Sequence, residues 1–175
     1  MKVIRFPLLL LLAVMSFFTK SNAESLKAGD AAPAISGITE TGATLDFAGV
    51  YKQGYTLVYF YPKADTPGCT KQGCSLRDSY AELKDKGVTV IGVSHDDAAA
   101  QKAFKEKFHL PFTLIADTDS AVIKAFGVPN IPMTSLATRQ AYLIDKTGKV
   151  VWADYKASTD KQAQDVLAEL AKLGG

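Results

Sequence analysis

The chain has 175 residues, of which 47% are hydrophobic and 22% are charged, a size and composition typical of one ordinary globular domain. Its 20 basic residues nearly balance its 18 acidic ones. This balance argues against the basic surface of a nucleic-acid-binding protein, and the composition argues against a disordered chain.

The first 23 residues follow the order of segments in a secretory signal peptide. Lys2 and Arg5 precede an apolar run over residues 6–18, and residues 21–23 end in the small side chain of Ala23. The alternative is a retained membrane anchor, but the run is shorter than the roughly 20 apolar residues that span a bilayer. We therefore expect residues 1–23 to be cleaved and residues 24–175 to form one domain. That domain is expected to be exported, to the periplasm, without stable membrane association.

Strand and helix patterns follow one another in the first half of the domain. Residues 35–47 predict a β-hairpin with its turn at residues 40–42. Residues 55–61 form a continuous β-branched and aromatic run, typical of a strand that is buried on both faces, so its aromatic side chains are expected in the core. Apolar side chains at helical spacing then predict a helix over residues 75–84.

The second half continues this alternation. Strands are expected at residues 88–93, 112–115, 141–144 and 150–153, and helices at residues 97–108, 120–126 and 161–173. The order predicts a layered α/β protein with a sheet of mixed strand directions. Sites in such proteins lie at the carboxyl ends of strands, and the segment after Tyr61 lies at such an end.

Both cysteines of the chain, Cys69 and Cys74, lie shortly after this strand end. Helical propensity rises after Pro67 and Gly68, which places Cys69 in the first turn of a helix that Thr66 could cap. Unpaired backbone N–H groups and the helix dipole favour a thiolate at that position. A partly exposed thiolate is a nucleophile, so Cys69 is a candidate catalytic residue.

The spacing of the two cysteines bears on whether they form a permanent disulfide. In an intact helix, five residues rise about 7.5 Å and leave the Cα atoms roughly 8 to 9 Å apart, beyond the limit of about 7 Å for a disulfide. A structural disulfide remains an alternative in an exported protein, but here it would require the helix to unwind. Gly73 weakens the helix by up to about 1 kcal/mol relative to alanine, and we interpret it as easing that unwinding.

Two other kinds of cysteine site are disfavoured. A zinc site would need His95 and His109, which come from different segments of the chain. The spacing also differs from the Cys-x-x-Cys of thioredoxin-like exchange proteins.

The stretch YFYPKADTPGCTKQGCSLRD, residues 59–78, resembles the peroxiredoxin family, in particular its peroxiredoxin Q or bacterioferritin comigratory protein branch. Pro62-x-x-x-Thr66-x-x-Cys69 matches the active-site motif of the family, and the second cysteine of the branch follows five positions later. The resemblance runs from about Leu26 to the C terminus. It includes residues 112–129 and 139–145 and is poor over residues 130–137.

The resemblance implies a thioredoxin-like fold, with a central mixed β-sheet flanked by helices and an N-terminal β-hairpin. It also implies a thioredoxin-dependent, atypical two-cysteine peroxidase that reduces hydrogen peroxide and organic hydroperoxides in antioxidant defence. Cys69 would be the peroxidatic cysteine and Cys74 the resolving cysteine, with Thr66 and Arg139 as polar partners and Pro62 shielding the pocket. The Cys69 sulfenic acid would form an intramolecular disulfide with Cys74, which a thioredoxin-like dithiol protein reduces. No metal or organic cofactor is expected, and the protein is expected to be a monomer.

The chemistry of these residue types agrees with the resemblance. The Thr66 hydroxyl and the Arg139 guanidinium can both donate to a peroxide whose leaving oxygen gains negative charge. Taken singly, each residue has a structural alternative: Pro62 could simply end the strand, Thr66 cap the helix and Arg139 be a solvated charge. Two rival functions are a redox relay that passes its disulfide to a partner, and a disulfide-stapled binding domain.

Overall fold

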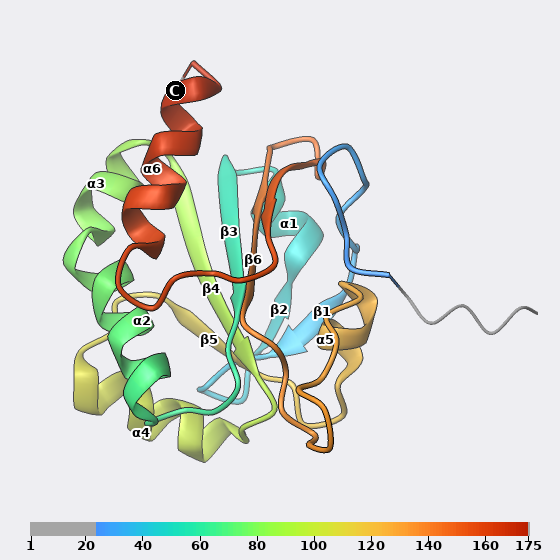
Figure 1. Ribbon diagram of the computed structural model, residues 1–175, viewed down its shortest axis with the longest axis vertical. Coiled ribbons are helices and arrows are strands. Elements are labelled where there is room, and N and C mark those ends of the chain that lie inside the picture. Colours follow the sequence, from blue (N-terminus) through green and yellow to red (C-terminus); the bar gives the residue numbers. More distant parts are fainter. Residues whose placement is uncertain (1–23, 175) are drawn as a thin grey trace, which may run out of the picture.

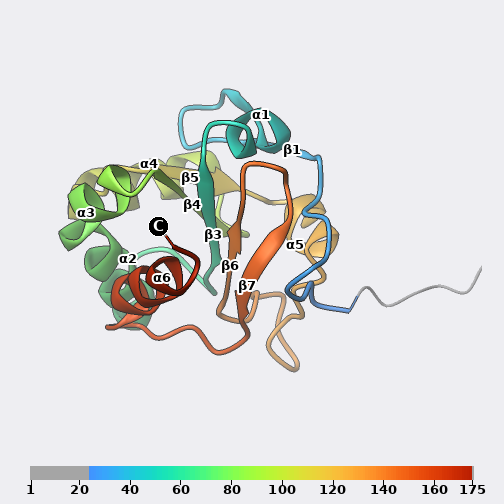
Figure 2. The same ribbon diagram turned by 90° about the horizontal axis from the view of Figure 1, so that it is seen from above.

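The computed structural model describes residues 24–174, so the expected signal peptide at residues 1–23 lies outside the described residues. A five-stranded sheet with the order β5-β4-β3-β6-β7 stands at the centre and carries helices on both faces (Figures 1 and 2). Its strands are β3 (Tyr55–Phe60), β4 (Val88–Ser94), β5 (Thr113–Ala116), β6 (Gln140–Ile144) and β7 (Val150–Asp154). A separate hairpin consists of β1 (Ser36–Ile38) and β2 (Thr44–Asp46). The helices are α1 (Phe47–Tyr51), α2 (Pro67–Asp78), α3 (Tyr80–Asp85), α4 (Ala98–Phe108), α5 (Ala121–Ala125) and α6 (Gln162–Lys172).

Strand directions confirm the predicted mixed sheet. The central strand β3 is parallel to β4 and antiparallel to β6, while β4 and β5 are parallel and β6 and β7 antiparallel. Phe60 at the end of β3 lies opposite Gln140 at the start of β6. The segment after β3 and the segment before β6 therefore meet at the same edge of the sheet.

Two hydrophobic cores lie on the two faces of the sheet. The first lies under α2, α3, α4 and α6 and includes Tyr59 and Tyr61, and the second lies under α1 and α5 and includes Phe60. Neighbouring strand residues point to opposite faces, so a strand covered on both sides is apolar at every position. All three aromatic side chains are buried, as predicted from the uninterrupted run.

The N-terminal hairpin forms where it was predicted, with Gly42 in its turn at a φ of +82°. The helix predicted over residues 75–84 is instead two helices, α2 and α3, which are separated at Ser79. The short helix α1 was not predicted. Asp46 caps it by accepting hydrogen bonds from the N–H groups of Ala48 and Gly49, and its five residues are too few to show a helical period.

Among residues 24–174, no helix combines the length and the apolar composition needed to cross a bilayer.

Candidate active site

Cys69 lies in the first turn of α2, as the sequence predicted. The helix begins at Pro67, and its first hydrogen bond into the preceding loop runs from the N–H of Thr70 to the carbonyl of Thr66, at 2.8 Å. The N–H groups of Gly68 and Cys69 precede that bond, at the end of the helix where the dipole is positive. The partial exposure expected of Cys69 is wrong for this conformation: the residue is only 2% exposed, because its side chain packs into the first hydrophobic core, and it is a free thiol.

Arg139 directs its guanidinium at this thiol. Its Nη2 lies 3.4 Å from the Cys69 Sγ, although the two residues are 70 positions apart in the chain. The pairing of β3 with β6 brings them together, because Arg139 immediately precedes the strand that lies alongside the end of β3. A Cβ atom at Gly68 would lie 3.3 Å from the same Nη2, so the glycine leaves room for the guanidinium.

Gln72 holds the guanidinium and Gln162 holds Gln72, and the sequence analysis missed both glutamines. Gln72 accepts a hydrogen bond from Arg139 Nη1 and donates one to Gln162, the first residue of α6. Both glutamines are fully buried. The spacing of three residues between Cys69 and Gln72 on one helix was a signal that could have identified Gln72. Gln162 has no comparable local signal, because it reaches the site from the last helix.

Thr66 and Pro62 lie in the turn between β3 and α2. Thr66 occupies the N-cap position, but its hydroxyl donates to the carbonyl of Lys63 at 2.9 Å and makes no side-chain cap. The structural alternative of a side-chain cap at Thr66 is therefore wrong. Pro62 is half-buried directly after Tyr61.

Acidic side chains fix this turn from neighbouring elements. Asp96, after β4, accepts from the N–H of Ala64 at 2.8 Å. Asp65 has a φ of +55°, and its carboxylate pairs with Lys107 of α4 at 2.7 Å. The turn that carries the motif is thus tied to both β4 and α4.

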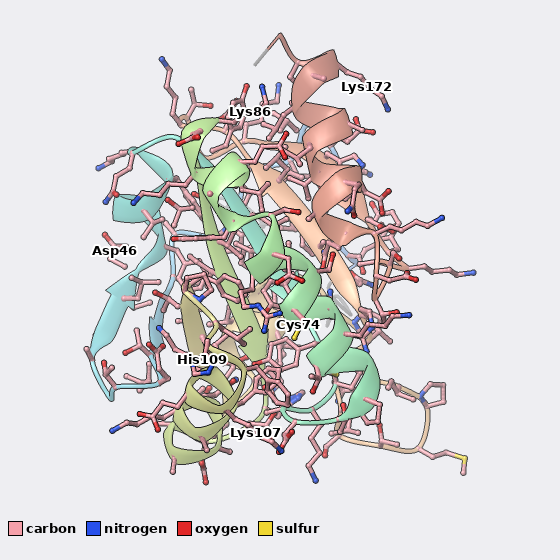
Figure 3. The ribbon with its side chains drawn as sticks, turned by 90° about the vertical axis from the view of Figure 1, so that its left-hand side faces the viewer. Asp46, Cys74, Lys86, Lys107, His109 and Lys172 are labelled. Carbon is pink, nitrogen blue, oxygen red and sulfur yellow. The ribbon has the colours of Figure 1, made fainter. Side chains whose placement is uncertain are left out.

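Cys74 lies on the same helix as Cys69, is half-buried and is also a free thiol. The helix is continuous between the two cysteines. Figure 3 shows Cys74 on α2, on the side of the molecule where α4 ends near His109. The structure is therefore the reduced, helical conformation, in which helix geometry keeps the two sulfurs from bonding.

Tyr59 belongs to the same hydrophobic core as Cys69. Its ring stacks on Tyr61 with a centroid separation of 5.4 Å, and its buried hydroxyl has no hydrogen-bond partner among the described residues. Burial, together with the neighbouring Tyr61 and Cys69, raises the pKa of Tyr59 well above 10.0. The Tyr59 phenol is therefore uncharged at neutral pH.

Comparisons with known sequences point to one family. The model of the AhpC/TSA family matches residues 28–153. The chloroplastic peroxiredoxin Q of Oryza sativa subsp. japonica is 46% identical over 145 residues, which make up 83% of this chain and 65% of the rice protein. That of Arabidopsis thaliana is 50% identical over 94 residues, 54% of this chain and 44% of the plant protein. The chain thus spans less than two thirds of the length of these curated relatives.

Solved structures show the same fold. Peroxidoxin BcpB from Mycobacterium tuberculosis superposes with a TM-score of 0.79 at 29% identity, covering 85% of this chain and 98% of that one. The bacterioferritin comigratory protein of Xanthomonas campestris, studied for its alkyl peroxide reduction activity, superposes with a TM-score of 0.76 at 28% identity. The superposition covers 83% of this chain and 100% of that one. The chain therefore has a thioredoxin-like fold and belongs to the AhpC/TSA family, in the peroxiredoxin Q and bacterioferritin comigratory protein branch.

Proposed function

We propose that the protein is a thiol-dependent peroxidase, an atypical two-cysteine peroxiredoxin that reduces hydrogen peroxide and organic hydroperoxides in antioxidant defence. The observation that carries this proposal is the Arg139 guanidinium 3.4 Å from the Cys69 sulfur, at the start of a helix. A fixed positive charge and the helix N-terminus both favour the thiolate, which is the reactive form of cysteine.

In the first step, the Cys69 thiolate attacks one peroxide oxygen and the O–O bond breaks. Cys69 becomes a sulfenic acid, and the second oxygen leaves as hydroxide or alkoxide and takes up a proton. Negative charge moves from sulfur to the leaving oxygen, so donors aimed along that path stabilise the transition state. Arg139 and the Cys69 N–H are such donors, the Thr66 hydroxyl can rotate to become another, and Pro62 shields the sulfur from water.

In the second step, the Cys74 sulfur attacks the Cys69 sulfenic sulfur. The S–S bond forms, the S–O bond breaks and the hydroxyl group leaves as water after protonation. The first turns of α2 must unwind for this step, because the intact helix keeps the cysteines apart. A thioredoxin-like dithiol protein then reduces the disulfide by thiol–disulfide exchange. None of these steps calls for a metal or an organic cofactor.

Partners and location belong to the same proposal. The basic, apolar and small-residue order of residues 1–23 supports cleavage of a signal peptide and export to the periplasm, whereas the plant relatives are named as chloroplastic. The reductant would be a thioredoxin-like protein of the same compartment, and the protein would act as a monomer with no stable membrane association. The near balance of charges supports the expectation that it does not bind nucleic acid.

The test uses Cys69→Ser and Cys74→Ser, each as the control for the other. With several hydroperoxides and a dithiol in excess, the parent should turn over many equivalents of peroxide, and Cys69→Ser should show only the background rate. Without the dithiol, Cys74→Ser should consume one equivalent and then stall, because its sulfenic acid has no resolving partner in the chain, and with the dithiol its recycling should be slower than that of the parent. A parent that consumes at most one equivalent would support the redox relay instead, and a Cys69 that stays oxidised and inert in mild reductant would support the stapled binding domain.

A further inference from the structure

Arg77 is anchored beside Cys74 by a group outside their helix. Its Nη1 donates to the carbonyl of Phe108, the last residue of α4, at 2.8 Å, and its Nη2 pairs with Asp78 at 2.7 Å. Residues three apart lie on the same side of a helix, which places Arg77 next to Cys74. The hydrogen bond with Asp78, and to a lesser degree the Cys74 sulfur, raises the pKa of Arg77, so the guanidinium stays charged beside this thiol.

The position of Cys74 gives its sulfur little other help toward ionisation. It lies in the second half of α2, more than a turn from the N-terminus whose dipole acts on Cys69. The helix N-terminus that acts on Cys69 is therefore too far away to act on Cys74 in the same way.

The other titratable groups around Cys74 do not supply a fixed positive charge. Tyr59 of β3 is neutral, because burial above all raises its pKa, and Asp78 is negative. Lys71 is exposed and pairs with Asp160 at 3.3 Å, and His109 is exposed at the end of α4. Arg139 is directed at Cys69 and bound to Gln72, so Arg77 is the fixed cation next to Cys74 on α2.

We propose that Arg77 is a positioning residue for the resolving cysteine, which favours the Cys74 thiolate and holds it against the end of α4 while Cys69 moves toward it. This inference rests on the proposed peroxidase function. The Cys74 thiolate donates an electron pair to the sulfenic sulfur, the S–S bond forms, and hydroxide leaves and is protonated to water. The anchor at Phe108 lies outside α2, so it survives the unwinding of the first turns of that helix.

A purely structural role is the alternative, because the same hydrogen bond also caps the C-terminal end of α4. Glutamine at position 77 could still donate to the Phe108 carbonyl but carries no charge. Lysine keeps the charge and one donor group but loses the guanidinium fork. The pair Arg77→Gln and Arg77→Lys therefore separates charge from capping.

The first experiment mixes reduced protein with one equivalent of hydrogen peroxide without reductant. Quenching at intervals with dimedone and an alkylating agent, followed by mass spectrometry, counts sulfenic acid and disulfide separately. Arg77→Gln should slow disulfide formation roughly tenfold more than it slows oxidation of Cys69, and Arg77→Lys should recover most of the rate. Lys102→Gln, which removes an exposed charge from α4, should behave like the parent. The proposal would be overturned if Arg77→Gln slowed Cys69 oxidation as much as disulfide formation. It would also be overturned if Arg77→Gln and Arg77→Lys slowed disulfide formation equally.

The second experiment measures Cys74 without any peroxide chemistry. In a Cys69→Ser background, the rate of Cys74 alkylation by iodoacetamide is followed against pH. Arg77→Gln should move the midpoint up by about one pH unit, a roughly tenfold loss of thiolate below that midpoint. Asp78→Asn, which removes the competing carboxylate and leaves Arg77 in place, should move it down. An unmoved midpoint in either folded variant would refute the role of Arg77, even if the protein proves to be an active peroxidase. A parent that never oxidises Cys69 would refute the peroxidase function and leave this readout intact.

Discussion

At the scale of single residues, the site depends on a chain of buried polar side chains. Gln162 accepts from Gln72, Gln72 accepts from Arg139, and Arg139 reaches the Cys69 sulfur. Hydrogen bonds in a buried environment are strong and directional, so this chain fixes a guanidinium that would otherwise have several rotamers. The two glutamines position Arg139 without touching the reacting sulfur in this structure.

Gln72→Leu should therefore impair the first chemical step. The change keeps a similar volume but removes the acceptor for Arg139 Nη1, and a charge-assisted hydrogen bond of this kind contributes about 1.5 to 3 kcal/mol. We expect the second-order rate of Cys69 oxidation to fall at least roughly tenfold. Trp152, the single tryptophan of the chain, packs against the same core as Cys69, so its fluorescence can follow the reaction.

Gln164→Ala is the matched control, because Gln164 lies on the same helix as Gln162 but is exposed. Oxidation of Gln72→Leu at the parent rate would show that Arg139 needs no anchor.

At the scale of elements, α2 has two opposing requirements. It must be helical to present Cys69 to peroxide, and its first turns must open for the disulfide to form. The surface contacts that tie it to neighbouring segments are weak, since Lys71 and Asp160 form an exposed ion pair, a kind typically worth less than about 1 kcal/mol. Buried hydrogen bonds through Gln72 hold the helical form, whereas Gly73 weakens the interior of the helix, so the helix can meet both requirements.

Gly73→Ala should slow disulfide formation by stiffening α2. A Cβ at Gly73 would meet the side-chain atoms of Leu110 at 3.4 Å and of Phe104 at 3.6 Å, which are close but tolerable contacts. Alanine favours the helix by up to about 1 kcal/mol, so we expect up to roughly fivefold slower conversion of the sulfenic acid to the disulfide.

Quenching at intervals with dimedone and an alkylating agent, followed by mass spectrometry, would check this prediction. Thermal unfolding of the reduced protein is the control for packing. A variant that unfolds at a higher temperature but forms its disulfide at the parent rate would contradict the interpretation of Gly73.

At the scale of the whole molecule, the N-terminal hairpin is joined to β5 of the sheet by backbone contacts and by one buried carboxylate. Glu40 is 8% exposed and accepts from Lys105 of α4 at 2.5 Å and from the N–H of Leu114 of β5 at 3.0 Å. Burial by itself raises the pKa of Glu40, but the hydrogen bonds from Lys105 and from backbone N–H groups outweigh it and lower that pKa below 4.5. The ionised form is thus the one that stabilises the fold.

Glu40→Gln should lower the free energy of unfolding by about 2 kcal/mol at pH 7, because it weakens hydrogen bonds to a charged group. A lowered carboxyl pKa stabilises the folded state above the pKa of the unfolded chain, and the contribution is lost as the pH falls through the folded-state value. The difference from the parent should therefore shrink as the pH falls below 4.5.

Urea unfolding at a series of pH values measures this difference. Glu106→Gln, which changes an exposed glutamate of α4, should show little effect at any pH. A deficit for Glu40→Gln that stays constant or grows on acidification would contradict the assigned role of Glu40.

Features that depend on local chemistry could be predicted from the sequence alone. Propensities and periods within short windows predict the uninterrupted apolar run of β3, the hairpin turn and a helix start near Pro67 and Gly68, where α2 begins. The same information placed Cys69 in a first helical turn and predicted that an intact helix separates it from Cys74. The boundary at Ser79 and the short helix α1 were not predicted, because neither produces a distinct helical spacing of apolar residues in the sequence.

Which distant groups meet at the sulfurs depends on how the strands and helices pack in three dimensions. The antiparallel register of β3 with β6 brings Arg139 to Cys69, the packing of α6 beside α2 brings Gln162 to Gln72, and the end of α4 anchors Arg77. These contacts join residues far apart in the chain, and their geometry depends on how whole strands and helices pack. No local pattern contains that information, so the nucleophile was predictable from sequence while most of the groups that hold it were not.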